Sequence, residues 1–274
     1  MKPNKFIFLV FISVFWACQN AHQEPKENNA TIQKSIKEKV SIKTEKKQHD
    51  WSYEGETGPS HWSELEENSF CNGNFQSPVN IVKYKRDKRL KPIDFHYSKE
   101  TILHDVVNNG HTIQYDFEPG DYVVFEEESF QLKQFHFHEP AEHTIDGVRY
   151  PMAIHLVHQN ETGAFLVMEI LVKEGKSSKP FDFLESFLPI ANGETKLVNQ
   201  AFDMNLNLPK NKGYFTYVGS LTTPPCTEGV RWIIFKESIT VSLEQVELLK
   251  YLMPIQNFRN EQPIHGRVIL QTSF

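Results

Sequence analysis

The first residues that could do chemistry form a short run, Gln134-Phe135-His136-Phe137-His138, in which polar and aromatic side chains alternate. On a β-strand this alternation places Gln134, His136 and His138 on one face and the two phenylalanines on the other. Two imidazoles that project side by side from a rigid strand are a preorganised pair of metal ligands. The run therefore predicts a metal-binding strand.

A lone His-x-His pair is more typical of a solvated sheet face than of a metal site. A second segment therefore decides whether these two histidines are metal ligands. Met152–His158 is also typical of a strand, and there His155 shares a face with Ala153 and Val157, whereas His158 points the opposite way. A third nitrogen ligand from His155 completes a three-histidine set, with which Zn²⁺ keeps a fourth position for water. We therefore predict a zinc site made by the first pair and His155.

The same histidine pair also fits a different metal site. His136-Phe137-His138-Glu139-Pro140-Ala141-Glu142 has the His-x-His-x-x-x-Glu spacing of cupin metal sites, in which Glu142 would be a ligand. The protein would then be a jelly-roll metalloenzyme or binding protein. The cupin pattern continues with Pro-x-Gly and a further histidine, but here Pro119-Gly120 lies upstream. Residues beyond the pair must decide between the two sites.

Composition and charge exclude several function classes. The chain has 274 residues, a formal net charge of -6 and 3 Cys, which is typical of a globular protein rather than of a disordered or disulfide-dense chain. A nucleic-acid binder normally presents a basic face, so we expect no nucleic-acid partner.

The N-terminal residues predict export. In residues 1–18, two lysines precede an apolar run from Phe6 to Trp16 that is too short to span a bilayer, which is typical of a secretory signal. Ala17-Cys18 resembles a bacterial lipoprotein processing site, at which Cys18 would be lipidated. Cleavage near Ala21 is the alternative, and a signal that stays attached as an anchor is a third possibility.

Residues 19–50 predict a flexible polar linker, because they are rich in Lys, Glu, Gln, Asn and Ser and lack aromatic residues. We therefore expect an exported protein that a lipid anchor holds at a membrane, in the periplasm or at the outer membrane or cell surface.

From Trp51 to Phe274 the sequence predicts one mostly β domain. Short alternating or apolar runs predict strands at Thr112–Phe117, Tyr122–Phe125, Gln131–His138, Met152–Val157, Phe165–Val172 and Arg231–Phe235. Turn signals separate them, at Asn108-Asn109-Gly110, Glu118-Pro119-Gly120 and Asn160–Gly163. Ser242, followed by a leucine-rich run, predicts an amphipathic helix that ends before Pro254, and Phe181–Phe187 predicts a shorter helix.

Eight segments of this body, taken in order, resemble the α-class carbonic anhydrases. They are Tyr53 with Gly58-Pro59-Ser60-His61-Trp62, then Gln76-Ser77-Pro78-Val79-Asn80, Asn108-Asn109-Gly110-His111, Gln134–His138, Glu142-His143-Thr144, His155-Leu156-Val157-His158, Gly219-Ser220-Leu221-Thr222-Thr223-Pro224-Pro225-Cys226, and Asn257-Phe258-Arg259 with Gln262-Pro263. The resemblance covers Trp51–Phe274, and the short spacing between His138 and Glu142 is similar to the bacterial form. It implies a mainly β (α+β) single domain with a mostly antiparallel, twisted central sheet of about ten strands and short peripheral helices.

The resemblance also implies an activity, the zinc-dependent hydration of carbon dioxide to bicarbonate and a proton. His136, His138 and His155 would hold Zn²⁺, which lowers the pKa of its bound water to ~7 and so supplies hydroxide at neutral pH. Thr222 would accept a hydrogen bond from that hydroxide and donate its own to the buried Glu142. This relay would orient the hydroxide toward the substrate.

The resemblance also implies which residues bind the substrate. Carbon dioxide is apolar, and the resemblance implies an apolar subsite, with Thr222 beside it and Thr223 contacting substrate through water. The apolar residues of that subsite would be Val157, Val167, Leu221, Val230 and Trp232.

His111 matches the histidine that carries the product proton to buffer, a task suited to an imidazole with a pKa of ~6.5. Tyr53 and Gln114 would order the intervening water. Gln134 would hydrogen-bond the free nitrogen of a ligand imidazole.

Two cysteines remain after Cys18, and the resemblance implies that Cys71 and Cys226 form a disulfide. In an oxidising compartment such a bond would stabilise the loop that carries Thr222. Two buried thiols are the alternative.

One position departs from the family. Two residues before the third zinc histidine the family has a glutamate that receives the N–H of that imidazole, and here the residue is Ala153. We expect Glu169 to compensate, because an antiparallel pair that places Val157 opposite Val167 also places Glu169 opposite His155. Water or a backbone carbonyl is the alternative acceptor.

A non-catalytic cell-surface binding module on the same fold is the alternative function, since some family members have lost zinc ligands. Retention of the three histidines, Thr222 and Glu142 favours the enzyme.

Overall fold

The computed structural model describes residues 51–65, 68–253 and 256–274. The predicted signal of residues 1–18, with Cys18, and the predicted linker of residues 19–50 lie outside the described residues. Within the described part of the chain, no helix is long and apolar enough to cross a membrane.

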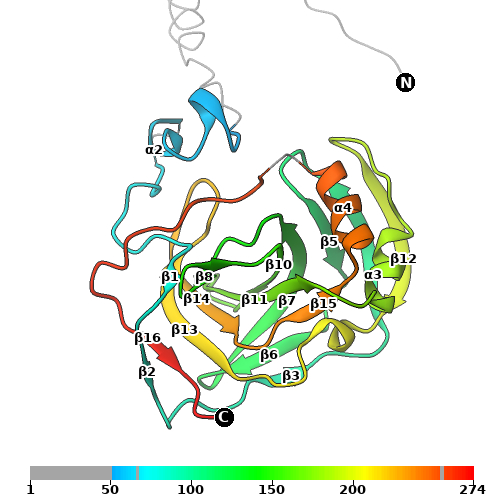
Figure 1. The fold of residues 1–274 in the computed structure, drawn as a ribbon. Helices are drawn as coiled ribbons and strands as arrows, with labels where there is room; N and C mark the ends of the chain where they lie inside the picture. Colours follow the sequence, from blue (N-terminus) through cyan, green and yellow to red (C-terminus); the bar gives the residue numbers. More distant parts are fainter. Residues whose placement is uncertain (1–50, 66–67, 254–255) are drawn as a thin grey trace, which may run out of the picture. The chain divides into compact units, whose positions relative to one another are not determined.

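A large twisted sheet dominates the fold and carries both histidine strands near its middle (Figure 1). Ten strands follow one another across it. In spatial order they are β12 (Thr195–Phe202), β4 (Thr101–Asn108), β5 (Ile113–Phe117), β7 (Glu128–His138), β10 (Met152–Gln159), β11 (Phe165–Glu174), β14 (Glu228–Phe235), β13 (Tyr214–Ser220), β16 (Ile269–Gln271) and β2 (Tyr84–Arg86). Three shorter strands pair beside this path, β15 (Ile239–Val241) with β11, β6 (Tyr122–Phe125) with β7, and β3 (Asp94–His96) with β6.

Most neighbours in this sheet are antiparallel. The parallel pairings join β14 and β15 to β11, and β2 to β16. A separate small sheet joins β1 (Asn80–Ile81), β8 (Thr144–Ile145) and β9 (Val148–Arg149). The described residues therefore confirm the predicted single, mainly β domain, with thirteen strands in the main sheet.

Short helices lie around the sheet. They are η1 (Gly55–Thr57), α2 (Trp62–Leu65), α3 (Lys179–Glu185), η2 (Met204–Asn207) and α4 (Leu243–Leu252). The predicted start of α4 is confirmed, because the Ser242 hydroxyl accepts from the Gln245 N–H while the Gln245 side chain accepts from the Ser242 N–H. Gln245 Nε2 also donates to Asp182 of α3 at 2.7 Å, which ties the two helices together.

The hairpin between β10 and β11 fixes a register on which the site depends. Asn160 Oδ1 accepts from the N–H of Thr162 at 3.1 Å and of Ala164 at 2.8 Å, and Gly163 takes a positive φ of 87°. This tight connection pairs Gln159 with Phe165, and the pairing then runs through Val157–Val167 to His155–Glu169. The predicted register is confirmed.

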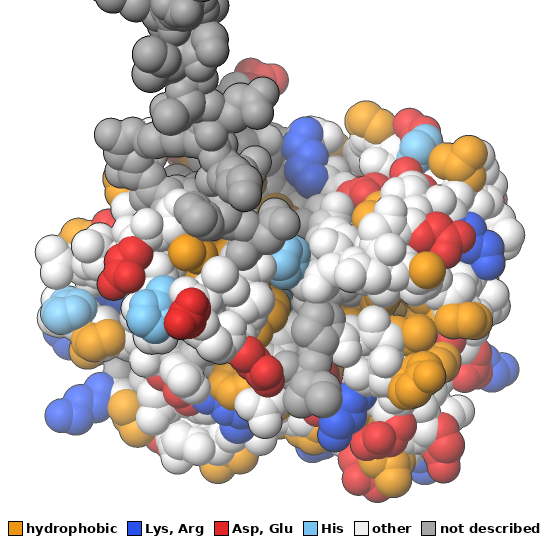
Figure 2. All heavy atoms as spheres, turned by 90° about the horizontal axis from the view of Figure 1, so that it is seen from above, with side chains coloured by type: hydrophobic (Ala, Val, Ile, Leu, Met, Phe, Trp, Pro, Cys, Tyr) orange, Lys and Arg blue, Asp and Glu red, His pale blue; other side chains and the backbone are white. Residues whose placement is uncertain are grey.

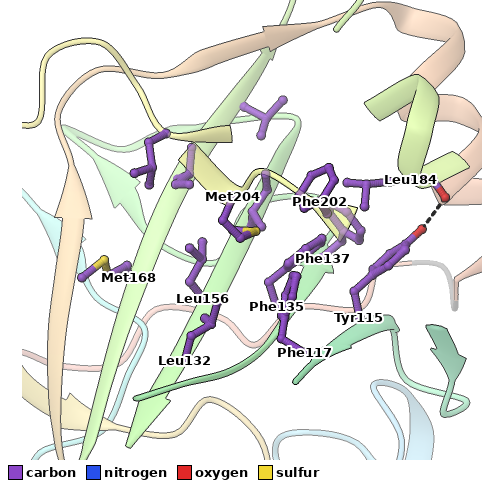
Figure 3. Close-up of a cluster of buried hydrophobic side chains, with 14 of the residues drawn as sticks. Tyr115, Phe117, Leu132, Phe135, Phe137, Leu156, Met168, Leu184, Phe202 and Met204 are labelled. Atoms are coloured by element: carbon purple, nitrogen blue, oxygen red, sulfur yellow. Dashed lines mark hydrogen bonds between the residues drawn. The ribbon is translucent and has the colours of Figure 1, made fainter. Parts of the chain in front are cut away.

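Alternation along the strands separates two cores. Phe135, Phe137 and Leu156 point to one side of the sheet, where they join a large aromatic cluster beneath α3 and η2 (Figure 3). Tyr115 closes this cluster and donates its hydroxyl to the Leu184 carbonyl at 2.9 Å. Burying these rings holds β7 and β10 rigid, so that the side chains on the opposite face are held in place.

The other face of the same strands carries the histidines and a smaller apolar cluster that includes Val157, Val167 and Trp232. On the surface, the face seen in Figure 2 intersperses the described Lys and Arg side chains with Asp and Glu.

Sequence patterns predicted six of the sixteen strands in the described residues, and three of the missed strands are long. β12 is almost entirely exposed and its apolar residues do not alternate with polar ones, so pairing with β4 rather than a local pattern makes it a strand. β4 and β13 were not predicted, since polar residues and glycine interrupt their apolar runs. The shorter predicted helix begins two residues earlier than expected, at Lys179.

The predicted disulfide is present. Cys71 and Cys226, which are 155 residues apart in the sequence, are bonded, and they pack beside the buried ring of Trp62. Because Cys226 ends the loop that follows β13, the bond ties this loop to the N-terminal part of the domain.

We expect the double variant Cys71→Ser/Cys226→Ser to lose about 2–5 kcal/mol of unfolding free energy, because the bond closes a long loop in the unfolded chain. Denaturant unfolding with and without reductant measures the change, and the double variant serves as the reductant control. Equal stability of the oxidised and reduced wild type would contradict this expectation.

Candidate metal centre

Strands β7 and β10 bring the three predicted ligands together. His136 and His138 lie on one face of β7, and the antiparallel register places His155 of β10 directly opposite His136. Nε2 of His136 lies 3.2 Å from Nε2 of His138. One ring nitrogen from each of the three histidines lies within 4.8 Å of the other two.

Hydrogen bonds fix which nitrogen of each ring faces this centre. Nδ1 of His136 donates to Gln134 Oε1 at 2.8 Å, and Nδ1 of His138 donates to the Asn257 carbonyl at 2.6 Å. Both acceptors lack a proton, so the Nε2 atoms of His136 and His138 carry the lone pairs that face inward. Gln134 therefore makes the contact predicted for it.

His155 has the opposite orientation. Its Nε2 lies 3.7 Å from Oε2 of Glu169, slightly longer than a hydrogen bond. Its Nδ1 lies 3.9 Å from Oε2 of Glu142, on the side of His138. Glu169 thus lies where the strand register predicts it.

This donor set fits a zinc ion. Two nitrogens bound at about 2.0–2.1 Å to one tetrahedral ion lie about 3.3 Å apart, close to the separation within the His136–His138 pair. Burial, followed by repulsion from His138 and His155, lowers the pKa of His136 well below its usual value. Burial likewise lowers the pKa of His138, so both rings favour the neutral form that binds metals.

Glu142 lies fully buried beside the three histidines. Its Oε1 accepts from the Arg259 N–H at 2.9 Å, while its Oε2 lies 3.6 Å from Nε2 of His138. In the described residues Oε2 has no hydrogen-bond partner, which leaves a buried acceptor aimed at the centre. Thr222 is buried and Thr223 half-buried in the loop that follows β13.

The predicted substrate residues lie together. Val157 pairs with Val167 across β10 and β11, and Val167 pairs with Trp232 of β14. Val230 belongs to the same cluster, and Leu221 packs against it. The Trp232 ring centre is 5.0 Å from that of His155, so this apolar surface adjoins the histidines.

His111 follows the Asn-Gly turn between β4 and β5. Its ring stacks on Trp51 with a centroid separation of 3.6 Å, and Tyr53 lies edge-on at 6.4 Å. Burial, then the charge of Glu142, raises the pKa of the Tyr53 hydroxyl well above its usual value. Tyr53 is therefore close enough to Glu142 to sense its charge.

Two residues with clear positions here were missed by the sequence reasoning. Asn257, besides accepting from His138, donates Nδ2 to the His111 carbonyl at 3.0 Å and to the Phe137 carbonyl at 2.9 Å. Trp51 stacks on His111. The Asn-Phe-Arg motif signalled Asn257, but its role depends on a contact between distant segments.

Gln114, which is predicted to order water near the centre, also has a side-chain partner. It lies opposite His136, and its Nε2 donates to Asp116 Oδ1 at 2.8 Å. Asp116 in turn lies opposite Asp105 on β4. Burial raises the pKa of Asp116 to about 6; Gln114 opposes this shift, whereas Asp105 adds to it.

The raised pKa of Asp116 predicts a stability change with pH. Between pH about 4 and about 6 the folded chain binds more protons at this group than the unfolded chain, so stability falls as pH rises through this window. Asp116→Asn should remove that loss. Because Asp116 is half-exposed, we expect a gain of only about 1 kcal/mol at pH 7 and little change at pH 4.

Thermal unfolding at both pH values measures the effect, with the exposed Glu100→Gln as the matched control. A larger gain for Asp116→Asn at pH 4 than at pH 7 would contradict the assigned direction.

The fold and the site together define a class before any comparison. A twisted, mostly antiparallel sheet presents three buried or half-buried imidazoles to one point beside an apolar surface, which is the arrangement of a candidate metalloenzyme for a small apolar substrate.

Comparison with known proteins identifies the family. The model of the eukaryotic-type carbonic anhydrase family matches residues 57–273. A carbonic anhydrase of Klebsiella pneumoniae is 40% identical over 226 residues, which cover 81% of this chain and 90% of that protein. One from Neisseria gonorrhoeae is 39% identical over 224 residues, covering 81% of this chain and 87% of that protein.

Solved structures agree. The α-carbonic anhydrase of Thermovibrio ammonificans, in complex with the inhibitor sulfanilamide, is 38% identical and superposes with a TM-score of 0.77 over 81% of this chain and 98% of that one. A hyperthermostable carbonic anhydrase from a hydrothermal vent chimney is 41% identical, with a TM-score of 0.77 over 82% of this chain and 100% of that one.

The chain belongs to the eukaryotic-type, or α-class, carbonic anhydrase family. Its activity is the reversible hydration of carbon dioxide, and the cupin-like enzyme and the non-catalytic binding module are not favoured. Its disulfide fits an exported protein.

Proposed function

We propose that this carbonic anhydrase is a zinc enzyme, with His136, His138 and His155 as the ligands. The observation that carries the proposal is the orientation of the three rings, since the outward nitrogens of His136 and His138 are held by acceptors and that of His155 faces one. When bound, Zn²⁺ lowers the pKa of a coordinated water to about 7, so that hydroxide is available at neutral pH.

Thr222 and Glu142 orient the attacking oxygen in this proposal. Glu142 is buried and is held from behind by the Arg259 N–H, and its Oε2 is an acceptor that faces the centre. A hydroxyl that donates to this carboxylate keeps only lone pairs for the reacting side. Thr222, buried in the adjacent loop, would thereby point the nucleophile at the substrate.

The apolar cluster receives the substrate. Val157, Val167 and Trp232 offer no hydrogen-bonding group toward carbon dioxide, apart from the Trp232 N–H, which is already donated to the Ser220 carbonyl at 2.9 Å. Leu221, Val230 and Thr223 complete the surface. Such a site favours carbon dioxide over water next to the nucleophile, and releases bicarbonate because it offers that anion few partners.

His111 takes the product proton to buffer. It lies at the edge of β5, half-buried, with one face stacked on Trp51. An imidazole both accepts and donates a proton through its ring nitrogens, which is what a proton shuttle requires. Tyr53 and Gln114 would order the water between His111 and the centre.

The location of the enzyme belongs to the same proposal. We propose that residues 1–18 are a lipoprotein signal, that Cys18 carries the lipid, and that residues 19–50 tether the catalytic domain, residues 51–274. The site would then be held in the periplasm or at the outer-membrane surface. The disulfide supports an oxidising compartment.

Stopped-flow hydration of carbon dioxide tests the function. We expect hydration by the zinc-loaded protein, its loss on chelation, and inhibition by an aromatic sulfonamide such as the one bound to the Thermovibrio relative. His138→Ala should abolish zinc retention in metal analysis. Hydration that is absent in protein with a full zinc load would favour the binding module, and a metal held through Glu142 would favour the cupin-like site.

The shuttle role has its own test. We expect His111→Ala to lower the hydration rate in weak buffer by about 100-fold, since general acid–base groups contribute at least this much. Added imidazole should restore the rate, and concentrated buffer should hide the defect. His61→Ala, which removes another half-buried histidine, is the control. Equal rates for His111→Ala and wild type in weak buffer would remove His111 from the mechanism.

A further inference from the structure

The carboxylate beside His155 also touches a second imidazole. Glu169, fully buried on β11, directs Oε2 toward Nε2 of His155 at 3.7 Å, and the same oxygen contacts Nδ1 of His143. His143 is fully buried and lies just before β8. The two rings therefore share one acceptor.

The contacts continue away from the centre. Nε2 of His143 lies 2.6 Å from the Tyr217 hydroxyl, which lies 2.7 Å from Oγ of Ser77. Oγ of Ser77 in turn accepts from the Ser220 N–H at 3.1 Å. All members are buried, so water does not compete with these bonds.

One assignment of donors and acceptors satisfies this series of hydrogen bonds. An ionised Glu169 can only accept, so Nδ1–H of His143 donates to it and leaves Nε2 of His143 as an acceptor. The Tyr217 hydroxyl therefore donates to Nε2 of His143, and the Tyr217 oxygen accepts from the Ser77 hydroxyl. The carboxylate has a further lone pair for Nε2–H of His155, which leaves Nδ1 of His155 as its unprotonated nitrogen.

No other carboxylate could take this place on the strand of His155. Ala153, two residues earlier on the same face of β10, is fully buried and has no acceptor. Burial alone would raise the pKa of the Glu169 carboxyl, but the two imidazoles, His143 foremost, hold this pKa well below its usual range.

We infer that His143 and Tyr217 are positioning residues of the metal centre, which hold Glu169 against His155 and link that ligand to Ser220, two residues before Thr222. The inference rests on the proposed zinc site. His143, His155 and Glu169 also form a group that could itself hold a metal, but the direct contact between His143 and Glu169 favours a hydrogen-bonded chain.

Two tyrosines make a matched experiment. Tyr217→Phe removes only the hydroxyl that fixes the His143 tautomer. Tyr97→Phe removes an equally buried hydroxyl, which lies 2.6 Å from Nε2 of His158, and His158 faces the opposite side of β10 from His155. Both variants lose one buried Tyr–His hydrogen bond, and Tyr217→Phe also loses the bond to Ser77, so loss of thermal stability cannot by itself distinguish the two roles.

The readout is zinc release to an excess of chelator, with the visible spectrum of the Co²⁺-substituted protein as a second measure. We expect Tyr217→Phe to release zinc about 3- to 10-fold faster than wild type, the equivalent of one net hydrogen bond, and to alter the cobalt spectrum. Tyr97→Phe should match wild type in both. Glu169→Gln, which has one acceptor atom for two donors, should release zinc about 10- to 100-fold faster.

Equal zinc release by Tyr217→Phe, Tyr97→Phe and wild type, or by Glu169→Gln and wild type, would overturn the inference while leaving the zinc enzyme intact. Failure of the wild type itself to retain zinc would instead overturn the proposed function. The two failures are therefore distinguishable.

Discussion

The proton on the outward nitrogen of each of the three converging imidazoles is the constraint on which the site depends. An imidazole binds a metal through a lone pair, and it presents that lone pair inward only if the opposite nitrogen keeps its hydrogen. Gln134 and the Asn257 carbonyl hold this hydrogen for His136 and His138, and Glu169 faces it for His155. A wrong tautomer in any ring would turn an N–H toward the centre, and the convergence of three rings would then repel rather than bind a cation.

The acceptors come from different parts of the chain, which explains how much of the fold serves one small centre. Gln134 shares β7 with its ring, and Glu169 reaches His155 from the neighbouring strand. Asn257, by contrast, lies in a segment without regular structure, anchored through its side chain to the Phe137 and His111 carbonyls.

Arg259, two residues on, anchors the same segment. Its guanidinium donates to Gln76 Oε1 and to the carbonyls of Ser77 and Cys71. Burial lowers the pKa of Arg259 to about 10, and the charge of Glu142 opposes the shift, so the group stays charged. A buried charge with this many acceptors holds the segment around Arg259 in place, against Cys71 of the disulfide on one side and Glu142 on the other.

Much of the site could be predicted from the sequence, because it depends on the two-residue repeat by which side chains of a strand alternate between the faces of a sheet. Alternation places His136 and His138 on one face, and the close hairpin at Asn160–Gly163 determines which residue of β11 faces His155. The apolar subsite residues follow from the resemblance. Trp51, Asn257 and the link from His143 to Tyr217 could not be read from local patterns, because each joins segments that are far apart in sequence.

Ala153 stands where the family has a glutamate, and Glu169 of the neighbouring strand faces the same imidazole. This difference separates what a sequence motif detects from what the chemistry requires. A motif asks for a carboxylate at a fixed distance along one strand, and at that position this chain has only a methyl group. The imidazole requires an acceptor at a fixed place in space, and in an antiparallel pair the residue directly opposite lies as close as the residue two positions along. Moving the carboxylate to β11 brings it against His143, whose other nitrogen meets Tyr217. A carboxylate that is absent along the strand therefore faces His155 from across the sheet, at 3.7 Å, and its contacts reach the segment preceding Thr222.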